Sequence, residues 1–161
     1  MSEKQVKGTA LKGSSDKKPI SSKEAFSLAP PRSPAVLCFE ERAGEHQLVL
    51  TEWFSWLNFT RNPMISFSMP RGSKASSLRE GDSFLLAIPP VGEAERFQKE
   101  VVVMAGSEEE NSLPALSSFE GHFIPKGTTV VLLCTLAGAY NYPFKKVRIF
   151  NCNLEQAFRM R

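Results

Sequence analysis

The sequence predicts a mainly β domain, built as an antiparallel barrel or sandwich that carries a few short helical turns. Two observations lead to this fold class. The chain contains six or seven short apolar or alternating runs bounded by Gly, Pro and polar clusters, and no βαβ alternation of strands with helices is visible. Its 161 residues, 42% of them hydrophobic, suffice for one domain with a substantial core.

An N-terminal arm precedes this domain. Residues 1–32 are rich in Lys, Ser and Gly and end at a Pro-Pro pair. They hold seven cations and three carboxylates, a net charge of +4; because the whole chain carries +3, residues 33–161 carry −1. We therefore expect a basic, low-complexity and loosely attached arm over residues 1–32, with Ile20 and Phe26 as anchors, and a folded domain over residues 33–161.

The expected strands are apolar runs or alternations of apolar and polar residues. Residues 35–39 and 47–51 flank a charged, glycine-containing stretch at hairpin spacing. Residues 128–137 form the most β-prone run of the chain. The other expected strands are residues 64–69, 84–88, 101–104, 118–124 and 146–152.

Helical turns and loops fill the intervals between these strands. Residues 73–80 predict one or two helical turns, because Ser73 can serve as the N-cap and Gly81 as the C-terminal stop. Ala75 and Leu78 then face inward. The remaining intervals are a short polar helix over residues 92–100, loops over 51–59 and 106–114, and a tail or short helix over 154–161.

The sequence lacks the motifs of several enzyme classes. Dinucleotide-binding, P-loop, α/β-hydrolase and zinc-protease patterns are all missing. Cys38, Cys134 and Cys152 are widely spaced within apolar runs, which indicates core residues and no metal or dithiol centre. We interpret His46 and His122 as satisfied structural residues. No catalytic side chain is therefore predicted, and any catalysis is expected to come from a bound cofactor.

The cellular location is predicted from two missing signals. The chain has no run of eighteen uncharged apolar residues, and its N-terminus lacks the apolar core of a secretory signal. We expect a cytoplasmic protein that does not enter a membrane.

The stretch RGSKAS has the composition of a phosphate-binding turn between a strand and a helix. Arg71 and Lys74 supply positive charge, and Gly72 lets the backbone approach a ligand closely. The hydroxyls of Ser73 and Ser76 supply hydrogen bonds, and free N–H groups at a helix start favour an anion. An ordinary capped helix with solvated cations explains the same residues, and the spacing alone favours that simpler interpretation.

Aromatic residues gather in the stretch TEWFSWLNF, which holds Trp53, Phe54, Trp56 and Phe59. Such side chains are costly to expose, so we expect them in the core, at a subunit interface or against a flat aromatic ligand. Core and dimer interface together explain most of them. The polar residues of this stretch, which could contact a heterocycle edge or cap the loop, are Thr51, Ser55 and Asn58.

Taken together and in their order along the chain, these pieces resemble the flavin reductase-like FMN-binding split-barrel family, especially its flavoredoxin branch. The resemblance covers about a third of the chain. Its segments are LVLTEW (48–53), RNPM (61–64), ISFSM (65–69), RGSKAS (71–76) and GDSFLLAI (81–88).

The resemblance implies a six-stranded antiparallel Greek-key split barrel with short helices, paired into a homodimer with FMN near the subunit interface. It implies a 5′-phosphate site made by Arg71, Ser73, Lys74 and Ser76. The residues that it implies around the isoalloxazine and ribityl groups are Thr51, Glu52, Trp53, Ser55, Trp56 and Asn58. The family's reductases take hydride from NAD(P)H and pass electrons to flavin or to another acceptor.

We therefore expect an FMN-binding oxidoreductase, either a flavin reductase or a flavoredoxin-like electron carrier with a redox partner protein. The chain has YNYPFKKVRIF where many family members show an Asp-His element, so the resemblance supports flavin binding more directly than reductase activity. One alternative is a non-catalytic flavin- or phosphate-binding module of the same fold. Another is a small β-barrel nucleic-acid binder that stacks bases on Trp53, Trp56 and Phe59, although the slightly acidic domain argues against it.

Overall fold

A computed structural model describes residues 17–58, 61–104 and 116–161 of the chain. Its strands are β1 (Lys17–Ile20), β2 (Val36–Arg42), β3 (Glu45–Leu50), β4 (Trp53–Asn58), β5 (Met64–Pro70), β6 (Ser83–Ile88), β7 (Val101–Met104), β8 (Leu116–Phe119), β9 (His122–Pro125), β10 (Val130–Asn141) and β11 (Val147–Met160). Its helices are α2 (Ser22–Leu28) and the short 3-10 helices η1 (Lys74–Ser77) and η2 (Ala94–Phe97). No helix in these ranges is long and apolar enough to cross a membrane.

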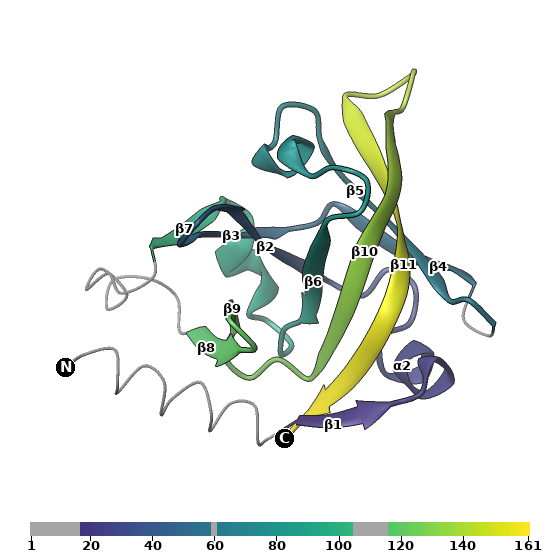
Figure 1. Cartoon of the computed structure of the whole chain (residues 1–161), viewed down its shortest axis with the longest axis vertical. Coiled ribbons are helices and arrows are strands. Elements are labelled where there is room, and N and C mark those ends of the chain that lie inside the picture. The colour runs from purple at the N-terminus through teal and green to yellow at the C-terminus, as the bar shows by residue number, and fades with distance from the viewer. Residues whose placement is uncertain (1–16, 59–60, 105–115) are drawn as a thin grey trace.

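One antiparallel sheet dominates the structure (Figure 1). Its strands follow the order β4-β5-β11-β10-β6-β2-β3-β7, and β1 adds to it by pairing with β11. Strand β11 is central, because it pairs with β10 along one edge and with both β5 and β1 along the other. Register shifts where β10 pairs with β11 introduce β-bulges, which bend a sheet and increase its twist. The mainly β, antiparallel prediction is confirmed.

The core is divided between the two faces of this curved sheet. In β2, for example, Leu37 enters one hydrophobic cluster, whereas the adjacent Cys38 enters the other. The first cluster is centred on Phe67, which stacks on Phe150 with ring centroids 5.0 Å apart and meets the edge of Phe84 at 5.8 Å. The second cluster includes side chains of η2 and of the separate β8–β9 hairpin. Burial of both faces explains why these strands are continuous apolar runs.

The strands that rest on clear apolar runs lie where the sequence predicts them. Strands β2 and β3 form the expected hairpin, and β5, β6, β7 and β10 match their predicted runs to within a few residues. Ser73 caps η1 as expected, since its Oγ accepts a hydrogen bond from the Ala75 N–H at 3.1 Å. Ala75 and Leu78 are buried, which confirms their inward orientation.

The aromatic stretch TEWFSWLNF forms strand β4 and not the predicted loop. Phe54 and Trp56 are buried, whereas Trp53 and Leu57 are exposed, so burial alternates with the period of two that a half-buried strand requires. Because aromatic residues stand at both buried and exposed positions of this stretch, the alternation is hard to recognise in the sequence. Phe59 lies outside the described residues.

Two further assignments near the C-terminal half are wrong. The single strand expected over residues 118–124 is a hairpin, because Glu120 and Gly121 both adopt positive φ angles (48° and 86°) and form its turn between β8 and β9. The expected tail over residues 154–161 continues strand β11, because β10 and β1 supply hydrogen-bonding partners on both sides. The expected loop over residues 106–114 lies outside the described part.

The N-terminal arm is only partly as expected. Ile20 and Phe26 pack against the core, which confirms them as anchors. Residues 17–32, however, are not loosely attached: β1 pairs with β11, and α2 buries Ala25 completely. The two short elements gain their stability from these tertiary contacts, which composition does not reveal. Residues 1–16 lie outside the described range.

The cysteines and histidines lie away from the clefts described below. All three cysteines are buried free thiols, as expected. His46 and His122 face each other with ring centroids 6.3 Å apart, and neither Nδ1 atom has a hydrogen-bond partner among the described residues. The expectation of satisfied histidines is therefore wrong. Burial lowers the pKa of both imidazoles, which favours their neutral forms.

Candidate functional site

An open cleft of about 720 Å³ lies where β3 and β5 end and the chain turns into η1. We call it the polar cleft. It is lined by Val49, Leu50, Thr51, Glu52, Met69, Pro70, Arg71, Gly72, Ser73, Gln98 and Glu100. The cleft thus brings together the two segments singled out by the sequence, the RGSKAS turn and the start of the aromatic stretch. Their meeting follows from sheet order, because β4 pairs with β5 and the Glu52 N–H donates to the Ser68 carbonyl at 2.9 Å.

The turn before η1 has the shape that close contact with a ligand requires. Gly72 adopts a φ angle of +88°, a left-handed conformation that glycine tolerates best, and there is open space where a Cβ atom would lie. Ser73 lies in the wall of the polar cleft while its Oγ caps η1. Among the described hydrogen bonds, none uses the N–H of Gly72 or of Lys74 as donor. A small polar ligand can therefore approach the backbone here.

Arg71 is held at the edge of the polar cleft by the β10–β11 hairpin. Its backbone N–H donates to the Lys146 carbonyl at 3.0 Å, and its Nη2 donates to the Tyr142 carbonyl. A guanidinium group has five N–H donors, so one such bond leaves others for a ligand. The hairpin therefore orients Arg71 without using up its hydrogen-bonding capacity.

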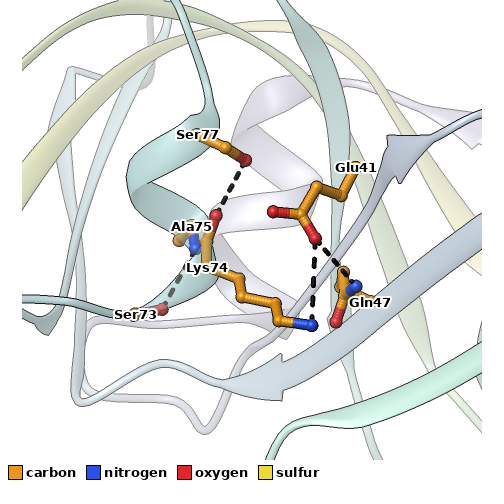
Figure 2. Close-up of polar contacts among 6 residues, drawn as sticks. All are labelled: Glu41, Gln47, Ser73, Lys74, Ala75 and Ser77. Carbon is orange, nitrogen blue, oxygen red and sulfur yellow. Dashed lines mark hydrogen bonds and ion pairs between the residues drawn. The ribbon is translucent and has the colours of Figure 1, made fainter.

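The other two predicted phosphate ligands do not line the polar cleft. Lys74 extends toward β2 and β3, where its Nζ lies 3.9 Å from Glu41 Oε1 (Figure 2). That oxygen also accepts a hydrogen bond from Gln47 Nε2 at 3.2 Å. Ser76 is exposed on η1. Of the four residues in the predicted cradle, the structure thus brings Arg71 and Ser73 to the polar cleft.

Groups of both charges surround the turn from β5 into η1, which we call the Arg71 corner. Besides Arg71 and Lys74, it includes three carboxylates, those of Glu41, Glu52 and Glu100. Burial raises the pKa of Glu100, while the charge of Lys74 lowers it and that of Glu41 raises it. The corner is rich in hydrogen-bond donors but is not strongly electropositive. Glu41 and Glu100 could not be predicted from the sequence, because Glu41 lies in β2 and Glu100 immediately precedes β7, and only the strand order brings these segments to the corner.

A second cleft, of about 490 Å³, adjoins the polar cleft. It is lined by Arg32, Ser33, Pro34, Leu50, Thr51, Glu52, Trp53 and Phe54, and shares Leu50, Thr51 and Glu52 with its neighbour. The Thr51 hydroxyl donates to the Ala35 carbonyl at 2.9 Å, so it can offer a ligand only its acceptor lone pairs. Glu52 is exposed. Thr51, Glu52 and Trp53 thus form one continuous wall from the Arg71 corner to the second cleft.

The other residues predicted around the flavin ring do not line either of the two clefts. Trp56 is buried, donates its indole N–H to the Ala29 carbonyl at 2.8 Å and meets Phe26 edge to face. Asn58 donates to the Arg61 carbonyl at 2.6 Å. Neither Trp56, Asn58 nor Ser55 lines the two clefts. The side-chain alternation of β4 explains why only part of the stretch reaches the site.

A third hollow, of about 620 Å³, lies on the outer surface of β4, β5, β11 and β10. We call it the aromatic groove; it is lined by Trp53, Leu57, Ser66, Ser68, Tyr140, Tyr142, Lys145, Val147, Ile149 and Asn151. Phe144, 84% exposed, lies at the adjacent hairpin tip and meets Tyr142 edge to face. Figure 1 shows this hairpin projecting beyond the rest of the sheet. Exposed apolar surface of this kind is typical of an interaction site.

Comparison with known proteins supplies the fold. No protein-family model matches this sequence, and no curated protein matches it. Several solved structures do resemble it. Flavoredoxin from Methanosarcina acetivorans is 18% identical with a TM-score of 0.59, over 81% of this chain and 70% of that one. The flavin reductase of styrene monooxygenase from Pseudomonas putida S12 is 16% identical with a TM-score of 0.58, over 84% and 83%.

A third similar structure is an FMN-binding domain of a flavin reductase-like enzyme from Shewanella baltica OS155. It is 16% identical with a TM-score of 0.62, over 89% of this chain and 77% of the other. The similarity extends well beyond the third of the chain that carried the sequence resemblance. The chain therefore has the flavin reductase-like split-barrel fold, as the resemblance implied. At this level of identity the comparison establishes the fold, and function has to be argued from the site.

Proposed function

We propose that this protein binds FMN, with the 5′-phosphate at the Arg71–Ser73 corner of the polar cleft and the isoalloxazine ring toward Trp53. One observation carries the proposal: the RGSKAS turn and the start of the aromatic stretch line two adjoining clefts that share Leu50, Thr51 and Glu52. The similar solved structures are flavin reductases and a flavoredoxin, which supports a flavin as the ligand. FMN is favoured over FAD because the corner offers donors for one terminal phosphate.

The residues present fit such a ligand at both ends. The Arg71 guanidinium can donate a charge-assisted hydrogen bond to a phosphate oxygen, and the open backbone at Gly72 allows close approach. Lys74 can add a second cation if it leaves Glu41. Trp53, 42% exposed, offers an aromatic face beside the second cleft.

A bound flavin would supply hydride and electron transfer, with NAD(P)H or a redox partner protein at the other end of the reaction. The chain's own residues would position the ring, and the surrounding carboxylates would tune its electrostatics. The activity that fits this site best is that of a flavin reductase or a flavoredoxin-like electron carrier. The cytoplasmic location expected from the sequence stays a prediction.

We also propose that two copies of this chain pair through the aromatic groove. Trp53, Leu57, Tyr140 and Tyr142 are all at least 40% exposed there, which is costly for a lone protomer. Aromatic side chains of this kind are enriched at protein interfaces. Because Trp53 borders both the groove and the second cleft, pairing here would place the flavin ring near the partner copy.

The phosphate contact can be tested by comparing FMN with riboflavin, which lacks the phosphate. Arg71→Ala combined with Lys74→Ala should weaken FMN by about 2–4 kcal/mol and leave riboflavin nearly unchanged. Flavin titrations followed by absorbance and fluorescence would measure both affinities. Arg61→Ala with Arg79→Ala is the matched control, because it removes two exposed cations that do not line the clefts. Equal losses for the two flavins would refute the proposed phosphate site.

A turnover assay distinguishes a non-catalytic flavin-binding module from an active flavin reductase. Purified protein with added FMN should oxidise NADH or NADPH, with absorbance loss at the nicotinamide band as the readout. Flavin binding without any nicotinamide oxidation would favour the binding module. The nucleic-acid alternative loses one of its stacking platforms, because Trp56 is buried with its N–H paired.

A further inference from the structure

Lys74 is surrounded by more acceptors than an exposed surface lysine usually meets. Its side chain extends toward Glu41 and Gln47 across the end of β2 and β3 (Figure 2). The distance from Nζ to Glu41 Oε1 is 3.9 Å, a loose ion pair. Glu100, in the wall of the polar cleft, lies near enough for the charges of Lys74 and Glu41 to act on it. The Lys74 ammonium thus pairs with Glu41 and also lowers the pKa of Glu100 through its charge.

Two of these neighbouring acceptors have no donor. Gln47 is completely buried, and its Oε1 has no hydrogen-bond partner among the described residues. Glu100 Oε2 is likewise buried without a partner. Unpaired carbonyl and carboxylate oxygen atoms carry partial or full negative charge, so together with the Glu41 carboxylate they favour a cation on this side.

The two cations of the corner thus differ in how firmly they are held. Arg71 is tied to the β10–β11 hairpin through its backbone N–H and through its guanidinium group. The side chain of Lys74 is held by one long ion pair and is 45% exposed. Of the two, Lys74 is the cation whose position a ligand can change.

We propose that Glu41 is a positioning residue that retains Lys74, so that a phosphate group entering the polar cleft must draw the Lys74 ammonium away from it. The nature of the competing anion rests on the proposed function. The Glu41 carboxylate then lowers the affinity for FMN and leaves the affinity for riboflavin unchanged. Glu41 keeps a hydrogen bond from Gln47 after Lys74 leaves, which limits the cost of the exchange.

Binding measurements on isosteric variants test this retention. Glu41→Gln should tighten FMN binding by about two- to fivefold, the range expected when a partly exposed ion pair is removed. Riboflavin affinity should stay constant. Glu95→Gln, which removes an exposed carboxylate of η2, is the control and should change neither affinity. In a Lys74→Ala background the gain should vanish; a gain that persists there, or no gain at all, would overturn the proposal.

A measurement without flavin separates this inference from the proposed function. In the ligand-free protein, an amine-acylating reagent should modify Lys74 faster in Glu41→Gln than in the wild type, as measured by peptide mass spectrometry. Lys126, exposed and distant in sequence, serves as internal standard. Unchanged labelling would refute retention. Faster labelling together with equal losses of FMN and riboflavin in the Arg71→Ala, Lys74→Ala variant would leave retention standing and refute the phosphate site.

Discussion

The polar cleft and the aromatic groove share strand β5 but differ in charge and in the kind of side chain that lines them. Along β5, Ser66 and Ser68 line the groove, whereas Phe67 fills the core and Met69 reaches the polar cleft. The polar cleft is lined by Arg71, which donates to the Tyr142 carbonyl, and by the carboxylates of Glu52 and Glu100. The groove presents tyrosine and tryptophan side chains with large exposed fractions.

This difference indicates two different kinds of occupant. A cleft with mixed charge and an open glycine turn fits a small ligand that can exchange hydrogen bonds with the protein. A wide aromatic surface without a comparable set of charges fits another protein surface, where buried apolar area provides the free energy of association. The strand pleat makes both possible, because successive side chains of one strand face opposite sides.

The largest effect on stability is expected in the core beneath β5, the strand that contributes to both the polar cleft and the aromatic groove. Phe67→Ala should lower the free energy of unfolding by about 3–5 kcal/mol, because the stacked and edge contacts with Phe150 and Phe84 are lost and a cavity remains. Urea unfolding followed by circular dichroism would measure this. Val91→Ala truncates a fully exposed apolar side chain outside the groove and should change stability by less than about 0.5 kcal/mol. Similar losses for both variants would contradict the assigned core.

The groove is tested by removing its aromatic rim. Tyr142→Ser with Phe144→Ser should weaken self-association by about 2 kcal/mol or more, roughly 30-fold in the dimer dissociation constant, as is typical of interface hot spots. Sedimentation over a range of concentrations would show it. Val91→Ser, which removes a fully exposed apolar side chain outside the groove, is the control. A wild-type protein that stays monomeric at high concentration would contradict pairing through the groove.

The two tryptophans of β4 sharpen the contrast between inner and outer faces. Trp56→Phe keeps an aromatic ring in the core but loses the hydrogen bond to the Ala29 carbonyl, so stability should fall by about 1 kcal/mol. Trp53→Phe, on the exposed face, should leave stability nearly unchanged and instead alter flavin binding. Thermal unfolding and flavin titration of both variants would check this. If Trp53→Phe lowered stability and Trp56→Phe altered flavin binding, the assignment of the two faces of β4 would be wrong.

The smallest expected effect is a pH dependence of the free energy of unfolding that arises from Glu100 in the polar cleft. Because burial raises the pKa of Glu100, the folded protein retains this proton to higher pH than the unfolded chain does. The associated stability is complete below the unfolded-state pKa and is lost as the pH rises through the folded-state pKa. Glu100→Gln should therefore be more stable than the wild type at neutral pH and indistinguishable from it at low pH.

Urea unfolding at several pH values would show this converging difference. Glu95→Gln, on the exposed surface of η2, should show no such convergence. A constant difference between Glu100→Gln and the wild type at all pH values would contradict a shifted titration of Glu100.

Much of the fold could be predicted because its strands carry local signals. The β2–β3 hairpin and the cap of η1 depend on residues that are neighbours in sequence. Strand β4 and the C-terminal half of β11 were missed because their strand character depends on pairing with β5 and with β10 and β1. Propensity alone does not record such distant partners.

Some residues of the candidate site could likewise be predicted from short sequence motifs, whereas others depend on strands that are distant in sequence. Arg71, Ser73 and Thr51 were found from short motifs, and the structure places them in one cleft. Glu41 and Glu100, which change the charge of the corner, reach it only through the order of β2, β3 and β7 in the sheet. An isolated glutamate in a strand has no sequence pattern that would reveal this role.

The most direct test of this account is a crystal structure of the protein with FMN. The account predicts the phosphate within hydrogen-bonding distance of the Arg71 guanidinium and the Gly72–Ser73 backbone, the Lys74 ammonium turned away from Glu41, and the ring beside Trp53. Clear density for FMN elsewhere, with the Arg71–Ser73 corner free of phosphate, would contradict it.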